Sequence, residues 1–414
     1  MFSLPKYSRT ALLVFSCLFK PVDSLGAASE PKDTTPAGAI LVCAGAGEGF
    51  FLIPGTEICL RVGGQVVAWQ EVNHAKKDLY VETTYLTDEP FLIYDTVNSR
   101  DRPPKNTTEV VTAFTTVSLT DYGPLLTHAS IKALQAAGMS LLHLDQAFIV
   151  AGGFTAGRRK SFFDYSTGFN FTEGYASDVT TNLIGYTKAI GERAKISVSL
   201  EENESRRIDD AVWSLRGSQS LPDLVVSARV DDRRWGNSQI SLAVQKLSDD
   251  RITNCCGPLR STLAWAASAG LELSPEVLGH QGRLLLSAAY ADGAMAYLGN
   301  LPFVTDYVVD ANGKIVKTSG FSLLASYEYL WSPRFKTMAT VSGLFARTKT
   351  RDLEWTPTGF MASIGAEYSP FAGSRLGIEG NYYRDIGRAK YLGIKGERST
   401  ASLAKLKTYL ARSF

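Results

Sequence analysis

Polar and apolar side chains alternate with a period of two from residue 404 to residue 414. One face of this segment carries Ala404, Leu406, Thr408, Leu410, Arg412 and Phe414, and the other carries Lys405, Lys407, Tyr409, Ala411 and Ser413. Such a period is typical of a β-strand with apolar material on one side and water on the other. Because any half-buried antiparallel strand has this pattern, the fold class depends on how often it recurs.

The alternation recurs along the whole chain. It is found at residues 60–68, 195–201, 237–245, 260–271, 321–331, 359–368 and 375–382. Several of these segments have the roughly 9–12 residues with which a tilted strand crosses a bilayer. Aromatic residues such as Trp331, Tyr368 and Phe414 fall at strand ends, where interfacial girdles would place them.

Two kinds of connection separate the alternating segments. Short ones lie at residues 121–124, 191–193, 331–334 and 369–373, and long polar ones lie at 73–106, 162–181, 202–222, 300–317 and 383–400. Tight turns on one side and long loops on the other predict an all-β fold, a transmembrane antiparallel β-barrel.

A soluble β-sandwich or propeller is the alternative fold. The second face of most segments carries Ser, Thr, Gly, Gln, Lys and Glu, where a sandwich needs dense apolar packing. No repeat of blade length is visible, and no apolar run reaches the roughly 18–20 residues of a membrane helix. The barrel is therefore favoured.

The N-terminus has the pattern of an export signal. Lys6 and Arg9 precede an apolar run at residues 11–19, and small residues at 26–28 offer a cleavage site. We expect a cleaved signal peptide at residues 1–28, an N-terminal segment with a cysteine pair at 29–57, and the barrel at 58–414. The net charge of +2 gives no electrostatic argument for nucleic acid as a partner.

Four cysteines remain after the predicted cleavage. Cys43 and Cys59 flank a loop-like stretch and can close a small ring in an oxidising compartment. Cys255 and Cys256 are adjacent in a polar stretch, where they could be free, paired with each other or paired between chains. No spacing of cysteine and histidine fits a zinc site, so we expect neither a metal nor a cofactor.

Several motifs resemble the general porins of alphaproteobacterial outer membranes (Rhizobiales type). Residues 47–64, GEGFFLIPGTEICLRVGG, match the family's aromatic-Ile-Pro-Gly-Thr run before its second cysteine, with Cys43 as the first. Residues 152–165, GGFTAGRRKSFFDY, resemble the segment that leads into the family's constriction loop. YADGAMAYLG at 290–299 and YEYLWSP at 327–333 follow in family order. The stretches 65–69 and 76–106 depart from the family pattern.

The resemblance implies a barrel of about sixteen strands in the outer membrane of a Gram-negative cell. It also implies a homotrimer surrounded by lipid and lipopolysaccharide, with short periplasmic turns and long outer loops. We expect passive transport of ions and small hydrophilic solutes through a water-filled pore. The alternative is a plugged barrel that acts as an adhesin or a structural protein, because the loops at 73–106 and 202–222 are long. An enzyme is not expected, since the glycine-rich residues 45–49 lack the strand and helix of a nucleotide-binding loop.

Charges that face one another across the narrowest section set the selectivity of such a pore. The loop at 161–178 is expected to fold inward and supply Asp164, Glu173 and Asp178. Candidate opposing cations are Arg61, Arg158, Lys195, Arg229, Arg375, Lys405 and Lys407, all but Arg158 on predicted inward faces. Asp164 and Glu173 are expected to face a basic wall that includes Arg61, and Phe414 to anchor the last strand in the membrane. The alternative for each charge is a solvated position without a special role.

Overall fold

The computed structural model describes residues 43, 46–76, 80–85, 90–95, 104–121, 123–136, 138–206, 221–232, 234–249, 260–277, 279–299, 304–310, 314–351, 353–391 and 394–414. The predicted signal peptide and the pair Cys255 and Cys256 lie outside these residues. Within the described part of the chain, no helix is long and apolar enough to cross a membrane.

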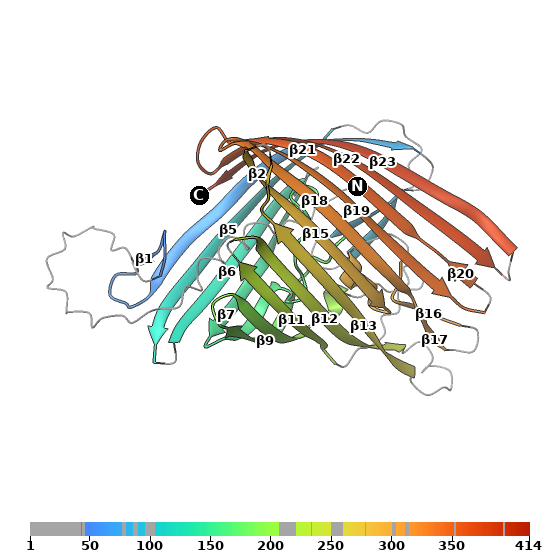
Figure 1. Ribbon diagram of the computed structural model, residues 1–414, viewed down its shortest axis with the longest axis horizontal. Helices are drawn as coiled ribbons and strands as arrows, with labels where there is room; N and C mark the ends of the chain where they lie inside the picture. Colours follow the sequence, from blue (N-terminus) through green and yellow to red (C-terminus); the bar gives the residue numbers. More distant parts are fainter. Residues whose placement is uncertain are drawn as a thin grey trace.

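Sixteen strands of the described residues form one closed antiparallel ring, and Figure 1 shows them running obliquely side by side in chain order. They are β2 (Cys59–Lys76), β5 (Lys105–Thr120), β6 (Gly123–Ala136), β7 (Met139–Ala151), β8 (Phe154–Lys160), β9 (Thr180–Ile190), β10 (Ala194–Glu201), β11 (Asp223–Asp232), β12 (Gly236–Asp249), β13 (Arg260–Leu273), β15 (His280–Asp292), β18 (Ser319–Ser332), β19 (Phe335–Lys349), β21 (Thr358–Tyr368), β22 (Ser374–Tyr391) and β23 (Ile394–Ser413). Each strand pairs with its neighbours in this order, and β23 pairs with β2. The predicted barrel is thus confirmed.

Shorter elements lie beside the ring or between its strands. Three of them join the main sheet: β1 (Phe51–Leu52), β14 (Glu276–Val277) and β20 (Leu353–Trp355). Two hairpins are separate, β3 (Tyr80–Tyr85) with β4 (Pro90–Asp95) and β16 (Tyr307–Val309) with β17 (Ile315–Lys317). Two 3₁₀ turns, η1 (Glu204–Arg206) and η3 (Met295–Leu298), complete the set that the described residues contain.

The two rims of the barrel differ in their connections. At the turn rim, the connections are residues 121–122, 152–153, 191–193, 233–235, 274–279, 333–334 and 369–373. At the loop rim, they are residues 77–104, 137–138, 161–179, 202–222, 250–259, 293–318, 350–357 and 392–393. Both ends of the ring, at Cys59 and Ser413, therefore lie on the turn rim.

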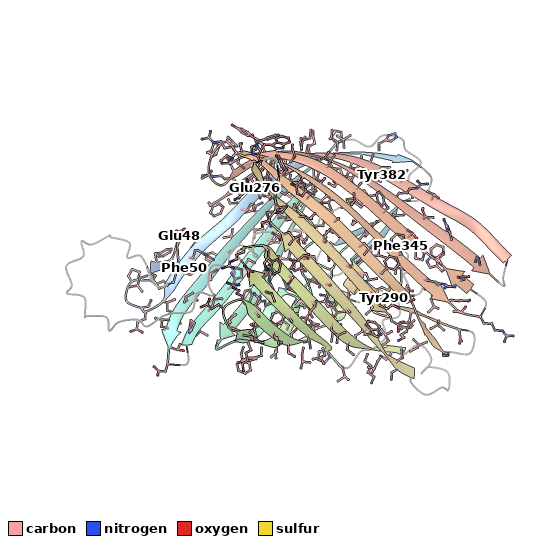
Figure 2. The ribbon with its side chains drawn as sticks, in the orientation of Figure 1. Glu48, Phe50, Glu276, Tyr290, Phe345 and Tyr382 are labelled. Carbon is pink, nitrogen blue, oxygen red and sulfur yellow. A yellow bond between two sulfur atoms is a disulfide. The ribbon has the colours of Figure 1, made fainter. Side chains whose placement is uncertain are left out.

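The alternating pattern divides the wall into two faces. Large apolar side chains such as Ile184, Leu323 and Ile364 point outward and are exposed, as are the aromatic residues Tyr290, Phe345 and Tyr382 on other strands (Figure 2). Polar side chains on the inner face, such as those of Ser199, Ser326 and Thr340, are buried. An apolar exterior around a polar interior is the reverse of a soluble protein and suits a barrel surrounded by lipid.

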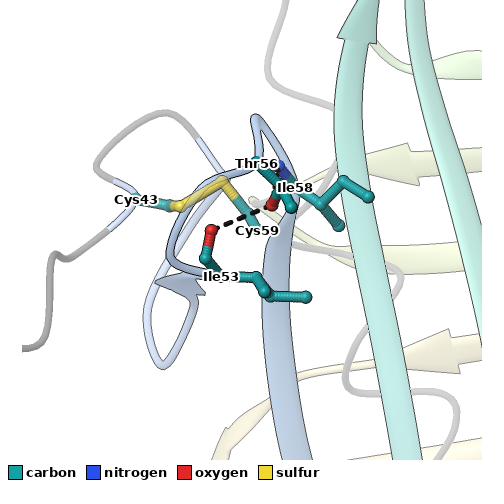
Figure 3. The surroundings of a disulfide bond; sticks show 5 residues. All are labelled: Cys43, Ile53, Thr56, Ile58 and Cys59. Carbon is teal, nitrogen blue, oxygen red and sulfur yellow. Dashed lines mark hydrogen bonds between the residues drawn. A yellow bond between two sulfur atoms is a disulfide. The ribbon is translucent and has the colours of Figure 1, made fainter.

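Cys43 and Cys59 form a disulfide with Cα atoms 6.0 Å apart, as the sequence predicts (Figure 3). The enclosed segment turns at Thr56, whose hydroxyl donates to the Ile53 carbonyl at 2.9 Å. Phe50 is buried beside Val117 at the turn rim, and the Arg61 guanidinium lies 4.8 Å from its ring centroid. The disulfide ring therefore packs on the inner face of the wall where β2 begins.

Candidate pore constriction

Residues 161–179, here called the inward loop, connect β8 to β9 and fold into the barrel. β8 has only 7 residues, whereas the preceding strand β7 has 13, so the chain leaves the wall before it reaches the loop rim. Most side chains of the inward loop are buried, among them Phe163, Tyr165, Phe169 and Phe171. The prediction that this segment folds inward agrees with its place in the structure.

The tip of the inward loop is attached to the far wall by backbone hydrogen bonds. The Glu379 carboxylate on β22 accepts from the Phe171 and Thr172 amides at 2.7 and 2.9 Å. The Phe169 amide donates to the Ser326 hydroxyl on β18 at 2.9 Å. The wall thus supplies acceptors for backbone amides that the inward loop buries.

Aromatic packing adds to the attachment of the tip. The ring of Phe171 stacks on Tyr409 of β23 with centroids 4.3 Å apart, and Trp69 of β2 meets it edge-on at 5.8 Å. The Arg283 guanidinium lies 4.4 Å from the Phe169 ring centroid. The inward loop therefore crosses from β8 and β9 to the opposite side of the barrel.

The two ends of the inward loop meet at a buried ion pair. Arg206 on η1 donates to Asp164 at 3.0 Å and to Ser177 at 2.7 Å. The second carboxylate oxygen of Asp164 accepts from the Val179 amide at 2.6 Å. Burial by itself lowers the pKa of the Arg206 guanidinium. The neighbouring Asp164 carboxylate raises that pKa by more, so the net shift of the Arg206 pKa is upward.

A second segment, residues 293–299 and 304–306 around η3, also packs inside the barrel. Tyr297 donates to Asp223 at 2.8 Å, and its ring meets that of Phe163 edge-on with centroids 4.7 Å apart. An apolar cluster surrounds it and includes Val225, Ala243, Leu247, Ala264, Ala266, Ala291, Ala294, Met295, Leu298, Val304, Leu344 and Ala346. This side of the barrel, from β11 to β19, is therefore filled like the core of a soluble protein.

Charged side chains lie on the inner face of the β2–β8 wall. Lys132 lies 3.9 Å from both Glu109 and Asp145. Glu71 lies 3.4 Å from Lys405 and 3.6 Å from Lys407 of the adjoining strand β23. These pairs put both signs of charge on the inner face of this wall.

A row of alternating charges, here called the charge chain, crosses six neighbouring strands on the turn-rim side of the inward loop. Its members are Glu272, Arg283, Glu328, Lys336, Glu367 and Arg375, joined in that order at 2.8, 3.2, 3.0, 3.1 and 3.8 Å. The cationic side chains are 42, 26 and 32% exposed in chain order, and the carboxylates 16, 6 and 5%. The charge chain has three carboxylates and three cations, but the cations are the more exposed to water.

The three predicted acids of the inward loop lie in different surroundings. Asp164 has a fully buried side chain paired with Arg206, so it faces neither water nor a basic wall that includes Arg61. Asp178 is buried and pairs with Lys160 at 2.9 Å. Glu173 is half-buried and contributes to the electrostatic field at Lys160. Asp164 therefore differs from its prediction, because a long-range partner covers it.

The predicted cations are spread along the wall. Lys195 and Arg229 point inward and share Asp231, at 3.5 and 2.8 Å. Arg375 belongs to the charge chain, and Arg61 lies beside Phe50. The Arg159 guanidinium lies on the inner face, 4.7 Å from the Phe148 ring centroid. Because successive residues of a strand take opposite faces, the neighbouring Arg158 lies on the outer face.

Sequence reasoning missed the residues that hold the inward loop. Arg206 lies in a long polar connection and Tyr297 in a motif whose role was open, so no local pattern indicated their contacts. A signal existed for the filled side of the barrel, because Val225, Ala243, Leu324 and Leu344 put apolar residues on faces that elsewhere carry Ser and Thr.

A closed ring of sixteen strands, apolar outside and crossed inside by a loop, defines a channel of the outer membrane. The comparisons agree with this class. A model of the family described as "Porin subfamily" matches residues 31–399, and the chain therefore belongs to that family. No curated protein matches the chain.

One solved structure above a TM-score of 0.5 shows the same fold at low identity. The outer membrane channel DcaP of Acinetobacter baumannii is 14% identical with a TM-score of 0.66, over 88% of this chain and 99% of that one. OprB of Pseudomonas putida is 9% identical with a TM-score of 0.49, over 86% of this chain and 94% of that one. At 14% identity, the likeness to DcaP is one of fold alone.

Proposed function

We propose that ions and small hydrophilic solutes diffuse between the inward loop and the β2–β8 wall. The observation that carries this proposal is the attachment of the inward loop to the far wall, through Glu379, Ser326 and Tyr409. We place the open part of the lumen beside the charged side chains on the inner face of β2–β8. As a porin of the outer membrane, the protein is a passive channel, with no reaction to catalyse.

Half-buried Glu173 is the acid of the inward loop that we assign to this passage, with Lys132 and Arg159 among the wall cations. Opposed charges in water-filled space interact by about 1 kcal/mol at 4 Å. That is enough to bias ion flux and too little to hold the barrel together. Glu173→Gln is expected to move the reversal potential under a salt gradient towards anion preference, and an unchanged potential would remove Glu173 from the passage.

We also assign the turn rim to the periplasm, residues 1–28 to a signal peptide, and the assembly to a homotrimer. A groove of about 750 Å³ on the outer face of the wall supports the trimer. Its exposed lining mixes small or polar residues with apolar ones, as a contact with another copy of the chain would use: Ala68, Gln70, Asn106, Thr108, Thr408, Phe335, Tyr368, Leu376, Ile378 and Leu410. The cysteine and Pro-Gly-Thr motif supports an alphaproteobacterial origin.

Planar-bilayer recording tests the channel function. Folded protein is expected to insert in discrete steps of ion conductance, and folded trimers that never conduct would contradict the proposal. The second candidate is a plugged barrel, favoured by the two segments inside the lumen. Vesicle swelling in small sugars separates the two, because only an open channel admits the solute.

A further inference from the structure

We propose that Arg206 is the positioning residue of the constriction: it latches three loop-rim segments together and so holds the inward loop at a fixed place in the lumen. This inference rests on the proposed channel function and concerns how the same site is regulated. Arg206 would act through the inward loop, since its own side chain is fully buried and cannot touch a solute.

The first part of the latch closes the base of the inward loop. Asp164 lies near its start and Ser177 near its end, and one guanidinium binds both, at 3.0 and 2.7 Å. Asp164 also accepts from the Val179 amide, at 2.6 Å. The two arms of the inward loop are thus held side by side where they leave β8 and return to β9.

The second part ties the base to the segment around η3. The Arg206 guanidinium lies 4.0 Å from the Tyr297 ring centroid, and Phe163 meets that ring edge-on. Tyr297 in turn donates to Asp223, which also accepts from Asn203 at 3.2 Å. A cation over an aromatic face is attracted more strongly when both are removed from water.

The third part fixes Arg206 itself. Its amide donates to the Asn203 carbonyl at 3.0 Å, so the side chain is set by η1, directly after β10. The planar fork of an arginine binds two acceptors at once and can lie over a ring, whereas a lysine is a point charge. Arg206 uses both properties, because its guanidinium donates to Asp164 and Ser177 and also lies over the Tyr297 ring.

The test compares Arg206→Gln, Arg206→Lys and the double variant Asp164→Asn/Arg206→Gln with the parent in planar bilayers. Arg193→Gln is the matched control, because Arg193 also binds one carboxylate, that of Asp232 at 2.7 Å, but is 56% exposed on the turn rim. We expect Arg206→Gln to raise open-channel current noise at least twofold and to close at lower voltage. Arg206→Lys should restore part of the parent behaviour, and Arg193→Gln all of it.

The double variant keeps the test decisive if Arg206→Gln fails to fold, because it removes both charges of the Asp164–Arg206 pair together. Folding is followed separately, by the heat-dependent mobility of the barrel on gels. Normal folding of the double variant with noisy, easily closed channels supports the latch. Parent-like noise and closure voltage in folded Arg206 variants would overturn it, whereas a parent that never conducts would instead refute the proposed function.

Discussion

Gly64 and Phe414 exchange both of their backbone hydrogen bonds, at 3.0 and 3.1 Å, and this pair joins the last strand to the first. The pairing continues along β2 and β23 from Gln65 with Ser413 to Lys76 with Ser402. Closure removes the last unpaired strand edges, which would otherwise be exposed to lipid.

The closure predicts a difference between two adjacent glycines. A Cβ at Gly64 would lie 2.7 Å from the Phe414 ring and against the Val111 carbonyl, whereas at Gly63 it would meet only the Phe414 carbonyl, at 3.4 Å. Gly64→Ala should lower the free energy of unfolding by about 1–3 kcal/mol, and Gly63→Ala by less. Urea unfolding in detergent measures both. Equal losses would show that the Phe414 ring can move aside.

The disulfide predicts a stability effect without loss of the channel. Cys43 and Cys59 are 16 residues apart, so their bridge should contribute about 3 kcal/mol by loop closure. Cys43→Ser/Cys59→Ser should lower stability by up to that amount and still conduct, because the barrel ring closes without the bridge. Peptide mapping without reduction should yield a cross-linked fragment. Alkylation of both cysteines in folded protein would contradict the bridge.

The charge chain predicts ion preference. Replacing Arg283, Lys336 and Arg375 by Gln removes the cations that face water and leaves the carboxylates in place. Since one charge pair is worth about 1 kcal/mol at 4 Å in water, the permeability ratio should move several-fold towards cations. Reversal potentials in a low-salt gradient measure it, and added salt should weaken it. Arg347→Gln is the control, because Arg347 is 55% exposed and on the outer face.

The tip of the inward loop predicts a local change in hydrogen exchange. Glu379→Ala removes the acceptor of the Phe171 and Thr172 amides, and each unpaired buried donor costs about 1–3 kcal/mol. Exchange at these amides should accelerate, as measured by mass spectrometry on fragments. Glu354→Ala removes a half-buried carboxylate at the loop rim, paired with Arg347 and Lys390, and should leave this exchange unchanged. Slow exchange at these amides in Glu379→Ala would contradict the prediction, because the other contacts of the tip would then hold it on the wall without Glu379.

The filled side of the barrel predicts unequal effects for two leucines. Leu344 is 1% exposed within the internal apolar cluster, and Leu242 is 45% exposed on the outer face. Leu344→Ala should cost about 2–5 kcal/mol of unfolding free energy through the cavity it leaves, and Leu242→Ala much less. Urea titration of the folded barrels compares the two, and similar losses would argue against a packed interior.

Sequence reasoning succeeded where neighbouring residues carry the information. The period of two placed Lys405 and Lys407 inward and Leu406 outward, because the strand geometry alone decides the face. The disulfide between Cys43 and Cys59 was also accessible, since both cysteines flank one short segment.

It failed where a contact joins distant segments. Asp164 lies in a motif that suggested a pore acid, yet its partner Arg206 comes from another loop-rim connection and takes it out of water. The attachment of Phe171 to Glu379 spans 208 positions of the chain, and neither residue carries a local sign of it. Alternation predicts which face a side chain takes, but not which other segment covers that face.

The apolar cluster inside the barrel gives the two halves of the wall different freedom to vary. Along β11 to β19, an inward residue such as Val225 or Leu344 packs against the η3 segment, so a change of size there is resisted as in any protein core. Along β2 to β8, inward residues such as Glu109, Ser130 and Lys132 are polar or charged, so a substitution there changes the charge of the wall without altering the apolar cluster. Adaptation to new solutes, or escape from a toxic one, should therefore arise mainly by substitution on one arc of the ring.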